Sequence, residues 1–137
     1  RPRTGFSRRM STSARERGSV VPEFVLVLVV LIPVVAAIVH IAFVLHVRNT
    51  ITSAASDGAR SGAARGATTD LAVMRTQSLI SSAVASHFAS DVQAQEIVRD
   101  GRAMIQVTVQ TRVPALGIAG PGTEVRAVAH AVLQDRP

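Results

Sequence analysis

The stretch "FVLVLVVLIPVVAAIVHIAFVL", residues 24–45, decides how this chain folds. It holds 22 residues without a charged side chain, and His40 is its one polar interruption. At about 1.5 Å per residue, a helix of this length spans about 33 Å, which matches a hydrocarbon core about 30 Å thick. A cleavable secretory signal has an apolar region of about 7–15 residues, which is shorter than this stretch. The sequence therefore predicts a single-pass transmembrane helix.

The net charge of +6 lies mostly in front of the apolar stretch. Residues 1–18 carry six arginines and one glutamate, whereas residues 19–137 carry nine arginines and eight acidic residues. A folded surface that follows phosphates would need that excess of charge itself, so we expect no nucleic-acid partner. Arginines on this flank predict a cytoplasmic N-terminus and an extracellular C-terminal part at the cell membrane. Met10 offers an alternative translation start, which would leave residues 1–9 outside the protein.

The chain divides into four regions by composition. They are a basic cytoplasmic leader, a transmembrane helix, a small-residue helix extension and a small exported domain, at residues 1–18, 19–47, 48–66 and 67–137. In the extension, Gly58, Gly62 and Gly66 recur every four residues with alanines beside them, which predicts a helix face that another helix can approach closely. A flexible linker is the alternative, because each glycine lowers helix propensity by about 1 kcal/mol relative to alanine.

The exported domain shows one helical pattern and then strand patterns. Thr69 or Asp70 is the expected helix cap, and an apolar stripe follows at Val73, Ile80, Val84 and Phe88. Residues 102–113 alternate between apolar and polar side chains, and "TEVRAVAHAVLQ" at residues 123–134 reads as another strand. Asp100-Gly101 predicts a tight hairpin between strands. The expected fold class is α+β, with a long N-terminal helix, an amphipathic helix and an antiparallel sheet of about three strands.

Few residues could carry chemistry. The absence of cysteine excludes disulfides, thiol chemistry and cysteine-ligated metals. The four histidines, His40, His46, His87 and His130, form no metal-binding motif, and no serine lies in a G-x-S-x-G context. We therefore expect no catalytic, cofactor-binding or metal site, no cofactor, no small-molecule substrate and no enzymatic activity. A secreted enzyme of unusual type is the alternative, and loss of an activity at a single serine or histidine would support it.

A second signal stands where the leader meets the apolar stretch. Gly18 ends the leader, and if Ser19 is counted as position one, Glu23 is fifth and Phe24 is sixth. A basic leader, a glycine, an acid at position five and a long apolar helix resemble the cleavage site of type IV-like prepilins. Helix capping is a compatible alternative, in which Ser19 caps the helix and Glu23 interacts with the helix dipole.

The segments "GSVVPEFVLVLVVLIPV", "LHVRNTITSAASDGAR", "VPALGIAGPG" and "VRAVAHAV" together resemble the TadE-like family. These proteins are minor pseudopilins of the Tad (tight adherence, type IVc/Flp) pilus system, and the resemblance, over residues 15–133, is to the actinobacterial type. It implies a pilin-like fold and a structural role in pilus biogenesis and adhesion. The chain departs from the commoner pattern at Pro22, immediately before Glu23.

The resemblance also implies the roles of particular residues and partners. A prepilin peptidase would cleave after Gly18, so that Ser19 becomes the new N-terminus, and Glu23 with Phe24 would act in assembly. The expected partners are that peptidase, other pilus subunits, the Tad assembly machinery and membrane lipid. A single-pass, membrane-anchored interaction or sensor domain that is never processed is the alternative.

Overall fold

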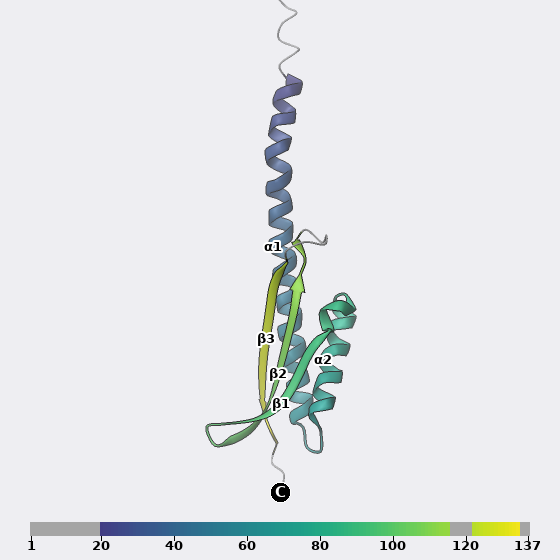
Figure 1. Cartoon of the computed structure of the whole chain (residues 1–137), viewed down its shortest axis with the longest axis vertical. Coiled ribbons are helices and arrows are strands. Elements are labelled where there is room, and N and C mark those ends of the chain that lie inside the picture. The colour runs from purple at the N-terminus through teal and green to yellow at the C-terminus, as the bar shows by residue number, and fades with distance from the viewer. Residues whose placement is uncertain (1–19, 116–121, 135–137) are drawn as a thin grey trace, which may run out of the picture. The chain divides into compact units, whose positions relative to one another are not determined.

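The computed structural model describes residues 20–115 and 122–134 (Figure 1). Its elements are α1 (Val20–Ala63), α2 (Thr69–Ala83), the short 3₁₀ helix η1 (Ser86–Ala89), β1 (Asp91–Arg99), β2 (Arg102–Val113) and β3 (Thr123–Val132). A long apolar helix, a second helix and a three-stranded antiparallel sheet confirm the predicted α+β class. The chain forms two units, residues 1–36 and 37–137, which are described separately below.

The first unit contributes the N-terminal part of α1. Pro22 and Glu23 lie in the first helical turns, where the missing N–H of proline removes no intrahelical hydrogen bond. The helix continues through Pro33. Most of its large apolar side chains are exposed to between 50% and 68% of their full area, as at Phe24, Leu26 and Ile32, whereas Leu28 is partly buried. By length and composition α1 could cross a membrane, and none of its most apolar window is buried, which is compatible with a single-pass anchor.

The second unit is built on a sheet with the strand order β1-β2-β3, antiparallel throughout. Asp100 and Gly101 join β1 to β2 with φ values of 53° and 74°, and Arg99 pairs with Arg102 across the turn. Positive φ at both central residues is what a type I′ turn requires, so the predicted hairpin is confirmed. Along β2 the alternation predicted from the sequence is also confirmed, because one side chain in two is buried, namely Ile105, Val107, Val109, Thr111 and Val113.

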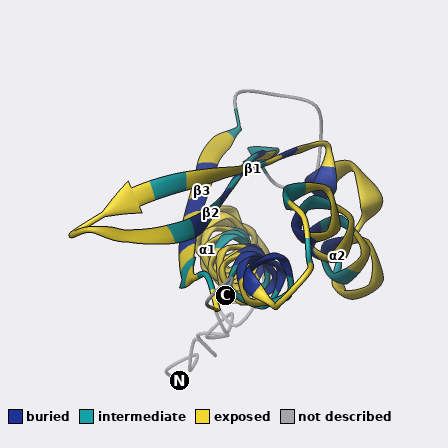
Figure 2. Cartoon of the chain, turned by 90° about the horizontal axis from the view of Figure 1, so that it is seen from below, coloured by how far each residue is buried: buried dark blue, intermediate teal, exposed yellow. Residues whose placement is uncertain are grey.

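Helices cover the buried face of this sheet. Figure 2 shows the buried positions of α1, α2 and the sheet facing one another, while the β1–β2 hairpin projects with exposed residues. One core cluster joins the inner face of the sheet to the C-terminal part of α1, to α2 and to η1. The helical members of this core are Val47, Ile51, Ala54, Ala55, Ala59, Ala63, Ala72, Ile80, Phe88 and Ala89. The end of the described chain is fixed to α1, because the Gln134 N–H donates to the Ala63 carbonyl oxygen at 3.1 Å.

Two boundaries differ from the sequence prediction. Helix α1 ends at Ala63 and not at residue 66, and a turn follows in which the Ala67 N–H donates to the Ala64 carbonyl oxygen at 3.0 Å and Gly66 adopts a φ of 78°, outside the helical range. The cap of α2 is Thr68, whose side-chain oxygen accepts a hydrogen bond from the Leu71 N–H at 3.4 Å, and neither Thr69 nor Asp70 takes that place. A cap must stand just outside the helix with extended dihedral angles, and Thr68 has them, at φ −126° and ψ 164°.

The predicted apolar stripe is divided between two elements. Val84 is already extended, and its N–H closes α2 by donating to the Ile80 carbonyl oxygen at 2.9 Å. Phe88 lies on η1, which the sequence analysis did not identify. Ile80 and Phe88 are buried and Val73 and Val84 are partly buried, so all four still contact the core.

Candidate functional site

The N-terminal candidate site is described only in part. Gly18 and Ser19 lie outside the described residues. Glu23 and Phe24 lie at the start of α1, where both are exposed, and Phe24 keeps 60% of its area accessible. A carboxylate in the first turn interacts favourably with the helix dipole, by about 0.3–1 kcal/mol. The described residues therefore place Glu23 where it can both support the helix start and meet a partner.

The predicted glycine face lies at a contact between α1 and α2. A methyl group on Gly58 would overlap the Thr76 hydroxyl oxygen and lie 2.8 Å from the Ala72 carbonyl oxygen. On Gly62 it would lie 2.6 Å from the Ala72 Cβ atom. Both distances are too short for carbon, so these two positions allow a backbone approach that larger residues would prevent.

Gly66 does not take part in this contact. It lies beyond the end of α1, and a methyl group built on it would meet no atom within 4 Å. Its left-handed φ of 78° is instead the reason for glycine there, because other residues rarely adopt it. The fourfold spacing therefore predicted one packing glycine too many. Periodicity alone cannot distinguish a glycine that packs against another helix from a glycine in the turn after the helix.

Polar contacts accompany the packing of α1 on α2. The buried Thr76 hydroxyl donates to the Ala72 carbonyl oxygen at 2.8 Å, with the Ala54 carbonyl oxygen of α1 at 3.5 Å. Arg75 Nε lies 3.3 Å from Asp57 Oδ2, with about half of each side chain exposed. An ion pair so open to solvent contributes about 0–1 kcal/mol, so close packing carries most of this contact.

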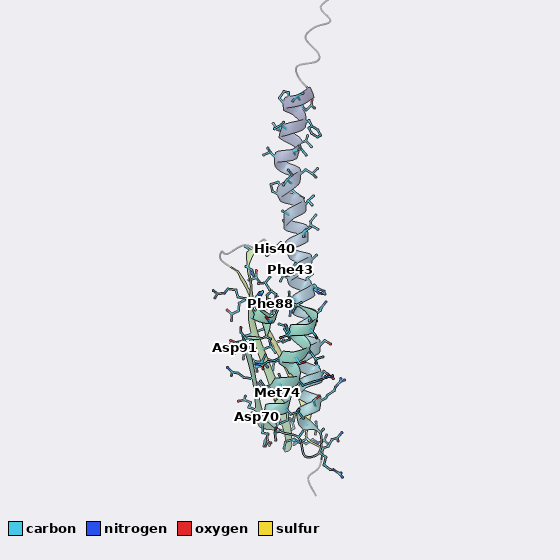
Figure 3. All side chains as sticks on the ribbon, turned by 90° about the vertical axis from the view of Figure 1, so that its right-hand side faces the viewer. His40, Phe43, Asp70, Met74, Phe88 and Asp91 are labelled. Carbon is cyan, nitrogen blue, oxygen red and sulfur yellow. The ribbon has the colours of Figure 1, made fainter. Side chains whose placement is uncertain are left out.

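An aromatic contact links α1 to η1. The rings of Phe43 and Phe88 meet edge to face with centroids 6.3 Å apart, and the His87 ring lies 3.9 Å from the Phe88 ring. Figure 3 shows Phe43 and Phe88 close together where η1 reaches α1. The sequence analysis placed Phe88 on an apolar stripe but did not pair it with Phe43, because 45 positions separate them and no local pattern connects them.

The described residues offer surfaces more than a reaction centre. An open groove of about 790 Å³ runs between α1 and the C-terminal half of α2, where polar side chains such as His46, Asp57 and Arg60 line it. Within residues 20–115 and 122–134, no group of three or more histidine, aspartate or glutamate side chains could hold a metal ion. The described residues form an exposed apolar surface along the N-terminal part of α1 and a close contact between α1 and α2.

A helix that is apolar and exposed at one end and packed into a small α+β unit at the other defines a candidate membrane-anchored protein. Residues 18–60 match the family model described as TadE-like protein. The matched segment runs from Gly18 through Glu23 and the apolar stretch to Arg60, and it leaves out α2 and the sheet. Comparisons with curated proteins and with solved structures gave no match. The match supports a relation to the Tad pilus for the N-terminal segment.

Proposed function

We propose that this chain is a minor pilin or pseudopilin, a structural part of a Tad-type pilus that acts in pilus biogenesis and adhesion. The observation that carries the proposal is the TadE-like match over residues 18–60, which includes the exposed apolar part of α1. A subunit that leaves the bilayer for a pilus needs an apolar helix that can exchange lipid for neighbouring helices, and α1 has such a surface. The chain is then the substrate of a peptidase and not an enzyme.

Processing would create the charge that Glu23 is suited to meet. Cleavage after Gly18 releases the α-amino group of Ser19, whose usual pKa of about 7.7–8.0 keeps it largely cationic at neutral pH. Two isolated charges near the apolar layer are each costly, and pairing them lowers that cost. The exposed Glu23 of one subunit can therefore neutralise the new N-terminus of its neighbour.

The proposal also gives a topology and a set of partners. The arginine-rich leader stays on the cytoplasmic side, where a prepilin peptidase removes it, and the part of the chain after the transmembrane helix, residues 48–137, stands on the extracellular side. Other pilus subunits and the Tad assembly machinery contact the helix during assembly, and membrane lipid contacts it before assembly. Neither nucleic acid nor a small-molecule substrate has a part in this function.

Mass spectrometry of the N-terminus, from membranes with and without the peptidase, tests this proposal. We expect the mature chain to begin at Ser19 when the peptidase is present and the leader to persist when it is absent. Gly18→Leu should block cleavage, because a side chain beside the scissile bond obstructs the backbone approach that glycine allows. Ala14→Leu places the same side chain elsewhere in the leader and should leave cleavage unchanged. Normal maturation of Gly18→Leu would overturn the prepilin assignment.

An anchored domain that is never processed is the second candidate, and two observations favour it. Pro22 stands immediately before Glu23, where the family pattern has another residue type. The core cluster of the second unit also joins its own helices to its own sheet. Under this alternative the leader persists in both membranes of the experiment above, so one measurement separates the two functions.

A further inference from the structure

The second unit has no spacer between its apolar helix surface and its packed core. Within this unit Ile41 and Leu45 of α1 expose 58% and 51% of their area, whereas Val47, on the next turn, is completely buried. Phe43, still 40% exposed, already contacts Phe88 of η1. Exposed apolar surface and folded protein therefore meet within about one helical turn, or about 5.4 Å.

The direction of α2 brings η1 to that boundary. Gly58 lies against Thr76 and Gly62 against Ala72, so positions rise along α1 as they fall along α2, and the two helices run antiparallel. The C-terminal end of α2 consequently points toward the apolar part of α1, and η1 follows that end directly. Figure 1 shows the C-terminal end of α2 pointing this way, while the β1–β2 hairpin lies at the opposite end of the unit.

Bilayer dimensions then give the depth of η1. If residues 24–45 fill a hydrocarbon core about 30 Å thick, the polar layer beyond Leu45 is about 5–8 Å deep on that side. Phe43 lies two positions, or about 3 Å, before Leu45, and the Phe88 ring is 6.3 Å from the Phe43 ring, so η1 lies within about 10 Å of the boundary between the hydrocarbon core and the polar layer.

The outer surface of η1 is suited to that environment. Ala85, Ser86, His87 and Ser90 are all exposed, and Ser86 and His87 offer a hydroxyl and an imidazole group beside the aromatic contact. The Ser90 hydroxyl donates to the His87 carbonyl oxygen at 3.0 Å. Phospholipid phosphate and ester oxygens accept hydrogen bonds from such groups, while the Phe43 ring can contact the upper acyl chains. We propose that η1 and Phe43 form a lipid-contact site, so that the packed unit rests directly in the headgroup layer of the bilayer. This inference rests on the proposed function in one respect, since α1 must span the membrane.

Single-cysteine variants test this depth without background labelling, because the chain contains no cysteine. Ser86→Cys places a nitroxide label on η1, and Ser78→Cys places the same label on an exposed position of α2, more than one helical turn before that helix ends. Val35→Cys reports whether α1 is inserted. The full chain is reconstituted in phosphatidylcholine–phosphatidylglycerol vesicles, and collision of each label with oxygen and with a water-soluble nickel complex is measured by spin resonance.

We expect the label at residue 35 to be shielded from nickel and the label at residue 78 to be fully accessible. The label at residue 86 should be several-fold less accessible to nickel than the label at residue 78. If residue 35 is shielded but residue 86 is as accessible as residue 78, the lipid-contact site is wrong and the membrane anchor stands. If residue 35 is itself accessible to nickel, the anchor fails, and with it the proposed function.

Discussion

The two parts of helix α1 use apolar residues in opposite ways. In the N-terminal part, large side chains such as Val25, Leu26 and Ile32 expose half or more of their area. In the C-terminal part, the buried positions are mostly alanine and glycine, with Val47 and Ile51 as the largest. Exposed apolar area costs about 25 cal/mol per Å² in water, so the first surface requires lipid or other helices, whereas the second is already satisfied within the chain.

The difference shows that hydrophobicity and burial need not coincide. A hydropathy pattern selects the exposed segment first, since it is the most apolar part of the chain. The core of the second unit depends on small residues that allow α2 to approach, and these residues give a weak apolar signal. The large side chains of α1 therefore contact the surroundings of the protein, whereas its small residues allow the helices to pack closely within the chain.

The largest expected effect comes from matched truncations in the two parts. Ile51→Ala should destabilise the second unit by about 2–5 kcal/mol, because Ile51 is completely buried and its loss leaves a cavity. Ile32→Ala removes the same atoms from a side chain that is 62% exposed, and should change the stability of that unit by less than about 0.5 kcal/mol. Both substitutions raise helix propensity equally, so that term cancels in the comparison.

Amide hydrogen exchange of strand β2 in the full, detergent-solubilised chain measures this difference. The strand lies in the core of the second unit, so its exchange reports opening of that unit and not of the apolar helix. If both truncations changed the exchange of β2 equally, the two parts of α1 would not differ in how they are packed.

A smaller effect is expected from filling the space at Gly58. Gly58→Ile would force α1 away from Thr76 and Ala72, at a cost of about 1–3 kcal/mol from overpacking, against a gain of about 1 kcal/mol at most in helix propensity. Ser53→Ile places the same side chain on an exposed position of α1 and is the matched control. The same exchange measurement should show destabilisation for Gly58→Ile alone.

A double variant identifies the cause of that loss. Gly58→Ala combined with Thr76→Ala removes the hydroxyl that a methyl group on Gly58 would overlap, so it should be more stable than the sum of the two single effects predicts. Additive effects would mean that the helices do not meet as closely as the structure shows.

Local patterns were enough to predict most of the fold. Alternation in residues 102–113 and the Asp100-Gly101 dipeptide predicted the strand and the turn, because pleating and turn dihedral angles are set by neighbouring residues. The exact cap was missed because Thr68, Thr69 and Asp70 are all good capping residues, and the choice depends on where α1 ends. The element η1 was missed because a 3₁₀ turn of four residues has no period of its own.

The contacts of the candidate sites could not be predicted from the sequence alone, because they depend on how the chain folds back on itself. The sequence predicted that Gly58 and Gly62 allow close packing, either on this chain's own sheet or against another subunit, whereas the structure places α2 of this chain against them. The Phe43–Phe88 contact depends on α2 returning along α1, and no spacing in the sequence encodes that return. Cleavage at Gly18 would depend on recognition by another protein, so it stays a prediction from the sequence and the family match.

The smallest effect on stability, and the most informative for function, is expected at Glu23. Glu23→Gln keeps the size of the side chain and removes its charge, so only the dipole interaction of about 0.3–1 kcal/mol is lost, and strand β2 should exchange as in the wild type. Insertion should be slightly easier, because a costly charge has left the membrane edge. If Glu23 pairs with the N-terminus of a neighbour, the variant should be processed to Ser19 yet remain in the membrane, with fewer crosslinks to other pilus subunits. Crosslinking and fractionation, with N-terminal sequencing to confirm cleavage, measure this.

Pro22→Ala is the matched control, since it changes the adjacent residue without removing charge, and it should assemble normally once cleaved. Should Glu23→Gln assemble as the wild type does, Glu23 would be a residue of the helix start alone, and the exposed part of α1 would need another device for pairing subunits.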